Sequence, residues 1–223
     1  MSAVAPPPSA LAAGLKALGL EASARQQDQL WGHALLMGKW NRVYNLTALR
    51  SPQDMLTHHL LDSLAVVPAL DRHLATGRGA ASAPLRVMDV GSGGGLPGVT
   101  LAVMRPQLQV VCVDAVVKKT TFIQQVAAEL GLDHLKAVHG RVEALSLPPF
   151  DLITSRAFAS LADMVALTRG HLAPGGVWMA MKGQHPHEEI AALPPDIEVF
   201  HVEPLTVPGL DAQRCVVWMR TTT

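Results

Sequence analysis

The chain contains 223 residues, of which 49% are hydrophobic and 16% charged, and its 18 basic and 18 acidic side chains give a formal net charge of zero. This composition excludes an intrinsically disordered protein, because disordered chains combine low hydrophobicity with high net charge. It also excludes nucleic-acid binding through general phosphate attraction, although a local basic patch remains compatible with it. Cys112 and Cys215 are far apart, so neither a disulfide framework nor a cysteine zinc site is indicated.

The first ten residues predict a disordered leader, since Pro6, Pro7 and Pro8 favour an extended chain. This segment lacks the positive region and the continuous apolar core of a signal peptide. No segment reaches the roughly 18 apolar residues that a membrane-spanning helix requires. We therefore expect a cytoplasmic protein.

Residues 11–80 predict a helical extension that precedes the main domain at 81–223. Ser23 and Ser51 are expected N-caps, and Pro52 occupies a first helical position. Gly19 is expected to stop the first helix, and Pro68 to end the third. The predicted helices cover 9–18, about 24–40 and 52–67. The small residues at 76–84 predict a flexible linker.

From Leu85 onward, short apolar runs alternate with helical segments. The predicted strands are 86–90, 109–114, 137–140, 151–155, 177–182, 198–204 and 214–220, and the predicted helices are 97–104, 118–130 and 161–172. Runs that are apolar throughout, rather than at every second residue, are typical of strands buried on both faces. We therefore predict an α/β fold in which helices cover a mostly parallel, seven-stranded, Rossmann-like sheet.

A glycine-rich loop follows the first predicted strand. Its glycines let the backbone turn tightly and approach a ligand closely. The dinucleotide pattern GxGxxG fails, because Leu96 occupies the sixth place counted from Gly91. The spacing of Asp89, Gly91, Gly93 and Gly95 instead resembles the first motif of methyltransferases that use S-adenosylmethionine (SAM). The alternative interpretation is a plain turn without a ligand.

Two further segments are compatible with a nucleoside. Asp114 ends the second predicted strand, where its carboxylate can accept hydrogen bonds from both ribose hydroxyls. This interpretation suits SAM and NAD equally, and an N-capping role before Lys118 is the alternative. After the third strand, Val142 can pack on an adenine ring and Glu143 can lie near its amine, unless the segment is only a solvated turn.

Several acceptor chemistries lack their characteristic residues. The Asn/Asp-Pro-Pro-Tyr/Phe motif of amino-group base methylation is absent after the fourth strand. Methylation at pyrimidine carbon 5 needs a nucleophilic cysteine, and both cysteines are expected in the core. The pairs His58–His59 and His185–His187 lack an evident third ligand, so we expect no metal site.

Basic residues follow several of the predicted strands. The carboxyl ends of parallel strands meet at one edge of the sheet, so Lys118, Arg141, Arg156 and Lys182 are expected to form a cationic rim there. We interpret Lys119 as an ordinary surface charge. Arg156, beside the small Ala157, is expected to be functional.

Three strings carry a family resemblance: Trp40 to Thr47 (WNRVYNLT), His59 to Ser63 (HLLDS) and Ser155 to Phe158 (SRAF). Together with the glycine loop they resemble the bacterial ribosomal RNA small-subunit methyltransferase G family, also called glucose-inhibited division protein B. The resemblance extends over nearly the whole chain after about residue 10. It implies a monomeric class I SAM-dependent methyltransferase with an N-terminal helical extension, which methylates guanine N7 in the 530 loop of 16S rRNA. The implied partner is 16S rRNA in the small subunit or in its assembly intermediate.

The resemblance also implies residue roles. The cofactor-binding residues are expected to be Gly91, Gly93, Gly95, Leu96, Asp114, Val142, Glu143 and Arg156. The residues expected to contact RNA are Lys118, Arg141, Lys182 and Arg214. Arg156 is further expected to position the acceptor guanine. Gly94 stands where many relatives have proline, which should loosen the loop.

Guanine N7 has an in-plane lone pair and no proton to lose, so positioning suffices and no general base is expected. Two other functions stay open: methylation of a small molecule or protein, and non-catalytic binding of SAM or RNA. Trp40 and Tyr44 either stack on RNA or, as we favour, anchor the extension to the sheet. His59 and Asp62 are expected in a structural hydrogen bond.

Overall fold

The computed structural model describes residues 8–44, 46, 51–77 and 84–222. The extension consists of α1 (Ser9–Ala17), α2 (Ala24–Tyr44), α3 (Pro52–Asp54), the π-helical segment η1 (Met55–Leu61), α4 (Asp62–Leu64) and α5 (Val67–Gly77). No helix among the described residues is both long and apolar enough to cross a membrane.

The main domain alternates strands and helices. Its strands are β1 (Arg86–Val90), β2 (Gln109–Asp114), β3 (Leu135–His139), β4 (Phe150–Arg156), β5 (Leu172–Lys182), β6 (Ile197–Pro204) and β7 (Cys215–Thr221). Its helices are α6 (Gly98–Met104), α7 (Val117–Leu130), η2 (Val142–Ala144), α8 (Leu161–Thr168), η3 (Arg169–His171) and α9 (His187–Ala191). The strand order is β3-β2-β1-β4-β5-β7-β6, and only β7 runs antiparallel to its neighbours. The predicted seven-stranded, mostly parallel sheet is therefore confirmed.

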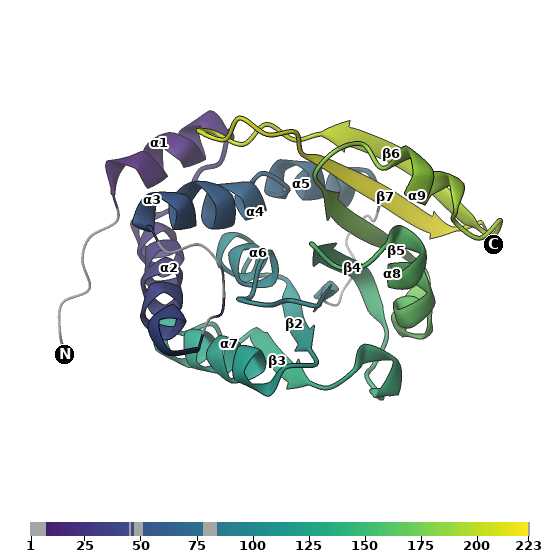
Figure 1. The fold of residues 1–223 in the computed structure, drawn as a ribbon, viewed down its shortest axis with the longest axis horizontal. Helices are drawn as coiled ribbons and strands as arrows, with labels where there is room; N and C mark the ends of the chain where they lie inside the picture. The colour runs from purple at the N-terminus through teal and green to yellow at the C-terminus, as the bar shows by residue number, and fades with distance from the viewer. Residues whose placement is uncertain (1–7, 45, 47–50, 78–83, 223) are drawn as a thin grey trace.

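The two faces of the sheet have separate cores, because successive residues of a strand point to opposite sides. Val87 belongs to a core shared with the extension, α6 and α7, whereas Met88 belongs to a second core with α8. In Figure 1 the helices α1 to α5 follow one side of the sheet, and α8 lies on the other. The extension therefore contributes to the main core of the protein.

Local sequence signals account for several helix boundaries. Ser23 and Gln26 form a capping box at the start of α2, in which Gln26 N–H donates to Ser23 Oγ (3.3 Å) and Ser23 N–H donates to Gln26 Oε1 (2.9 Å). Ser51 accepts from Asp54 N–H at 3.0 Å. Gly131 adopts φ of 63° just after α7, as a helix-ending glycine does.

The local structure departs from the predictions in several places. Pro68 was expected to end the third helix, but that helix already ends at Leu64, and Pro68 lies in the first turn of α5, where a missing N–H costs nothing. The short helix α9 was not predicted, and part of the predicted third helix is the π-helical η1. Most of the predicted leader and of the linker at 76–84 falls outside the described residues, but Ser9 already begins α1.

Trp40 joins the extension to the main domain. Its Nε1–H donates to Gln125 Oε1 of α7 (3.0 Å), and its ring meets Phe122 edge-on with centroids 5.5 Å apart. The predicted anchoring role is confirmed for Trp40. Tyr44 differs, because its ring lies against Trp40, with centroids 4.9 Å apart and planes tilted by 39°, but remains 46% exposed.

Candidate functional site

The glycine loop lies between β1 and α6, at the carboxyl edge of the sheet. Gly91 adopts φ of 67°, and a Cβ there would come within 2.5 Å of the Phe158 ring. Only glycine satisfies both the backbone conformation and the close approach. The carbonyl of Gly94 lies 2.8 Å from Nε2 of His33, a buried residue of α2. The extension therefore supports the loop that the sequence predicted to be loosened by glycine at this position.

Asp114 organises the next part of the site. Its Oδ2 accepts from Gly93 N–H and its Oδ1 accepts from Val116 N–H, both at 2.9 Å. Lys119 Nζ lies 3.6 Å from the same carboxylate. The interpretation of Lys119 as an ordinary surface charge was therefore wrong. Asp114 therefore holds the glycine loop in place. The alternative N-capping role is wrong, because the N-cap residue of α7 is Val116, and at this helix Asp114 accepts only from that residue's own N–H.

A pocket of about 420 Å³ opens at this edge of the sheet. Four residues of the predicted cofactor set are in its wall: Gly91, Asp114, Val142 and Glu143. Ala115, Lys119, Arg141, Ala157 and Phe158 also line it, and sequence reasoning assigned no cofactor contact to these five. Gly93, Gly95, Leu96 and Arg156 lie outside that wall. Pockets of this size at the strand ends of an α/β sheet are typical nucleotide-type sites.

The wall suits the nucleoside part of SAM. The carboxylate of Asp114 can accept hydrogen bonds from ribose hydroxyls, and Val142 presents an apolar side chain. The backbone carbonyl of Val142 lies 2.8 Å from His171 Nε2. Glu143 is bound to its neighbour, Arg141, at 2.6 Å on the exposed rim. The hydrogen bond from the Glu143 backbone N–H, and then the one from the Arg141 side chain, lowers the pKa of Glu143. A carboxylate, an apolar shelf and backbone approach at glycine together match an adenosine.

Ala157 is the one described non-glycine residue with positive φ, at 55°. It follows the last residue of β4 and lines the pocket. Such a conformation is costly for a residue with a Cβ, and it is maintained here at the site where the chain leaves the sheet. No pattern in the sequence signals it.

Asp89 is the acid that begins the glycine motif, and it is fully buried. Its Oδ2 accepts from Gly98 N–H at 2.8 Å, whereas its Oδ1 has no hydrogen-bond partner among the described residues. Burial raises the pKa of this carboxyl to about 7, and the Asp114 charge adds to the effect. The Gly98 N–H and the Arg156 charge act in the opposite direction.

This raised pKa makes stability depend on pH. Between pH 3.8 and about 7 the Asp89 carboxyl is protonated in the folded state and ionised in the unfolded state. The folded state therefore loses stability as the pH rises through this range. Asp89→Asn removes that ionisation and retains an oxygen for Gly98. Relative to wild type, the variant should therefore gain up to about 4 kcal/mol of stability across this range. Urea unfolding at several pH values measures the difference, and a difference independent of pH would contradict this assignment.

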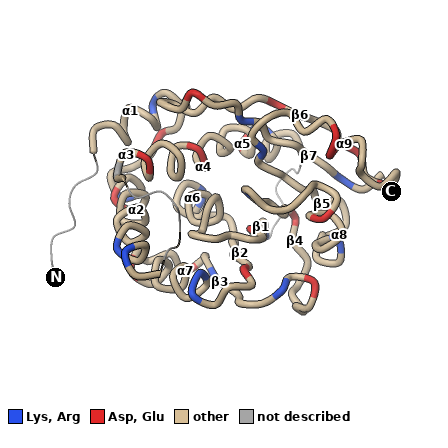
Figure 2. Tube along the Cα trace, in the orientation of Figure 1, with Lys and Arg blue, Asp and Glu red and all other residues tan. Residues whose placement is uncertain are grey.

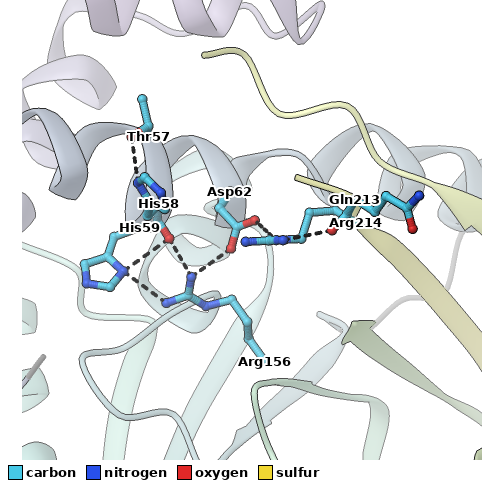
Figure 3. A network of polar contacts seen from close by, with 7 residues as sticks. All are labelled: Thr57, His58, His59, Asp62, Arg156, Gln213 and Arg214. Atoms are coloured by element: carbon cyan, nitrogen blue, oxygen red, sulfur yellow. Dashed lines mark hydrogen bonds and ion pairs between the residues drawn. The ribbon is translucent and has the colours of Figure 1, made fainter. Parts of the chain in front are cut away.

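Arg156 leaves β4 and reaches the extension (Figure 3). Its Nη1 donates to Asp62 Oδ2 (2.8 Å) and to the carbonyl of His58 (2.9 Å), and its Nη2 lies 3.4 Å from His59 Nδ1. The Arg156 side chain is 20% exposed. The arginine predicted to position the acceptor is thus itself held by an acid of the extension, beside the pocket wall at Ala157.

Asp62 also binds Arg214, whose Nε donates to its Oδ1 at 2.6 Å. One nearly buried carboxylate therefore holds two guanidinium groups, as Figure 3 shows. Burial, and then the Arg156 charge, lowers the pKa of His59 to about 4, so this imidazole is neutral near pH 7. His59 and Asp62 were expected in a structural hydrogen bond, and in the structure each of them contacts Arg156.

The other predicted basic residues also have partners. Lys182 Nζ donates to Glu189 Oε2 (2.7 Å) and to the carbonyl of Ala159 (3.1 Å), and Lys118 Nζ donates to the carbonyl of Tyr44 (2.9 Å). In Figure 2, both Lys or Arg and Asp or Glu are scattered over the described part of the chain. The expected cationic rim therefore consists largely of side chains that already have partners. Some partners are near in the sequence, as Glu143 is to Arg141, and others are distant, as Asp62 is from Arg156.

The alternative nucleophiles and ligands have ordinary positions. Cys112 is buried in β2, and Cys215 is buried at the start of β7, as expected. Burial raises the pKa of both thiols, which opposes formation of a reactive thiolate. Within the described segments, no group of three or more His, Cys, Asp or Glu side chains is arranged to hold a metal ion.

Comparison with known proteins places these features in context. A family model described as rRNA small subunit methyltransferase G matches residues 26–217. "Ribosomal RNA small subunit methyltransferase G" of Acidovorax sp. (strain JS42) is 60% identical over 213 residues, 95% of this chain and 94% of that protein. The protein of the same name from Methylibium petroleiphilum is 62% identical over 206 residues, which cover 92% of this chain and 90% of the relative.

A solved structure supports the fold. The N-methyltransferase NodS from Bradyrhizobium japonicum WM9 matches with a TM-score of 0.54 at 13% identity, over 73% of this chain and 97% of that one. At this identity the likeness concerns the fold alone. Together with the observed strand order, it confirms the class I methyltransferase fold that the sequence predicts.

Proposed function

The chain belongs to the rRNA small subunit methyltransferase G family, and from this premise we propose that it transfers a methyl group from SAM to N7 of a guanine in the 530 loop of 16S rRNA. The observation that carries the proposal is the pocket at the carboxyl edge of the sheet, whose wall combines Asp114, Val142 and Glu143 with the glycine loop.

When bound, SAM supplies a methyl group on a sulfonium, which the in-plane lone pair of guanine N7 can attack. The residues of this chain then have to bind and orient. Asp114 holds the ribose hydroxyls, Val142 packs on the adenine, and Gly91 allows the backbone to approach the cofactor. No side chain has to remove a proton, because N7 carries none. Placing the two reacting atoms in line supplies the main part of the rate enhancement.

Arg156 is the residue that we propose positions the acceptor guanine. Its guanidinium is fixed by Asp62 and by the carbonyl of His58, so it is oriented before the substrate arrives. Because N7 methylation leaves the base cationic, the arginine should act on guanine O6 or on a nearby phosphate. A fixed donor there restricts rotation of the acceptor base.

Substitution of Arg156 tests this role. Arg156→Ala should lower the rate of methylation by roughly 100-fold or more, as loss of a positioning contact does, and should leave SAM affinity measurable. Methyl incorporation from labelled SAM and calorimetric titration of SAM provide the two readouts. Arg169→Ala, in an exposed ion pair with Asp196, is the control for loss of a surface arginine. A methylation rate near wild type in Arg156→Ala would disprove the proposed role.

We propose further that the protein acts as a monomer in the cytoplasm, on the small subunit or its assembly intermediate. Residues 81–223 would bind the cofactor, and residues 11–80 would hold the glycine loop and Arg156 in place. Size-exclusion chromatography with light scattering tests the monomer. The alternative function, methylation of a small molecule or protein, predicts methyl incorporation that does not require rRNA in the assay.

A further inference from the structure

The exposed apolar side chains gather at one place in the structure. Across the described part of the chain, five large hydrophobic residues are classed as exposed. Two of them, Val43 (71%) and Tyr44 (46%), lie at the end of α2, and Val116 (38%) and Val117 (60%) lie at the start of α7. The fifth, Leu35, lies more than two turns earlier on α2. The hydrogen bond from Lys118 Nζ to the carbonyl of Tyr44, 2.9 Å long, joins the two helix ends.

The same place is basic. Lys39 and Arg42 are exposed in the last two turns of α2. Lys39 lies three residues before Arg42 and four before Val43, so it neighbours both on the helix surface. Figure 2 marks Lys and Arg on α2 and beside α7. Residues 39–44 and 115–119 include no Asp or Glu, and the adjoining Asp114 is buried. The first turn of α7 has no acidic residue but carries Lys118, although a positive helix end disfavours cations there.

This surface borders the pocket directly. Ala115 and Lys119 line the pocket, and Val116, Val117 and Lys118 lie between them in the sequence. Aromatic and apolar side chains interspersed with basic residues, beside the site of base chemistry, match the surfaces on which unpaired RNA bases stack while phosphates meet lysine and arginine.

We propose that Arg42, Val43, Tyr44, Val116, Val117 and Lys118 form the surface that docks the substrate RNA, which we call the α2–α7 surface. A base flanking the methylated guanine stacks on Tyr44, whose ring is backed by Trp40 at 4.9 Å. The inference rests on the proposed function and adds the place where the RNA binds. The absence of acidic residues from these two segments favours RNA over a protein partner.

A negative charge introduced at Val117 tests the surface. Val117 is the first residue of α7, where a glutamate is favourable to the helix, so Val117→Glu should fold at least as well as wild type. It should raise the KM for 30S particles roughly tenfold by repelling phosphate, without changing the Kd for SAM. Leu35→Glu places the same charge on an exposed hydrophobic position outside the surface and should leave both constants unchanged. Equal KM values for Val117→Glu and wild type would overturn the proposal.

Tyr44 provides the second arm. Tyr44→Ala should raise the KM for 30S particles roughly tenfold, whereas Tyr44→Phe, which retains the ring, should stay within about twofold of wild type. A photoreactive benzoylphenylalanine at position 117, irradiated with 30S particles, then identifies what the surface touches. A crosslink to 16S rRNA supports the proposal, and a crosslink to a ribosomal protein, or none at all, overturns it. If the wild-type protein methylates no rRNA in the same assay, the proposed function fails instead, so the wild-type reaction separates the two outcomes.

Discussion

Asp62→Ala should destabilise the protein by about 3 kcal/mol, the largest stability loss that we expect from a polar substitution in this chain. Asp62 is nearly buried and receives hydrogen bonds from Arg156 and Arg214 at 2.8 and 2.6 Å. Its removal leaves two guanidinium groups without their carboxylate. The destabilisation should lie near the lower end of the range for breaking a buried ion pair. The two arginine side chains remain 20% and 25% exposed and can therefore reach water.

Urea unfolding measures this loss, and an exposed ion pair supplies the control. Arg220 and Glu198 are 2.8 Å apart, with side chains 51% and 43% exposed, so Glu198→Ala should cost less than about 1 kcal/mol. Asp62→Asn, which retains one acceptor oxygen, should fall between the two. If Asp62→Ala were no more destabilising than Glu198→Ala, Asp62 would not join the extension to the main domain in the way described.

Asp114→Ala should weaken SAM binding by roughly 100-fold or more, since each of two hydrogen bonds from ribose hydroxyls to the carboxylate is worth about 1.5–3 kcal/mol. The substitution also removes the acceptor of two backbone hydrogen bonds, those from Gly93 N–H and Val116 N–H, whose nitrogens lie 2.9 Å from the Asp114 carboxylate oxygens. Both effects act on the pocket. Isothermal titration with SAM and with S-adenosylhomocysteine measures the affinity.

The control for Asp114 is Glu143, which lies on the exposed rim beside Arg141. Glu143→Ala should weaken SAM binding less than about fivefold, because solvent already competes for the adenine amine there. Thermal unfolding without ligand separates a damaged loop from a lost ribose contact. Wild-type affinity in a folded Asp114→Ala variant would exclude Asp114 from the cofactor site.

The fold was predictable because each of its parts depends on nearby residues. Continuous apolar runs indicated β1, β2 and β4 to within two residues, and Ser23 and Gly131 marked helix ends. The loop residues Gly91 and Asp114 were predictable for the same reason, since a strand followed by glycine and a strand ending in an acid are local patterns.

The pairing of the site's charges was not predictable in this way. Arg156 meets Asp62 across 94 positions of sequence, and Arg214 meets the same acid across 152. Composition and spacing give the number of charges but not which ones meet across such distances, so the sequence predicted a cationic rim without its acidic partner Asp62. His33 likewise reaches Gly94 from 61 positions away, and nothing in the local sequence of α2 marks it as a support of the loop.

The most direct test of the central claim is nucleoside mass spectrometry of 16S rRNA from cells that lack this chain, with the modified position mapped by digestion. We predict that 7-methylguanosine disappears from the 530 loop, and that it returns when purified protein and SAM are added to small subunits from those cells. A 530 loop that still carries 7-methylguanosine in the absence of the protein would contradict the account.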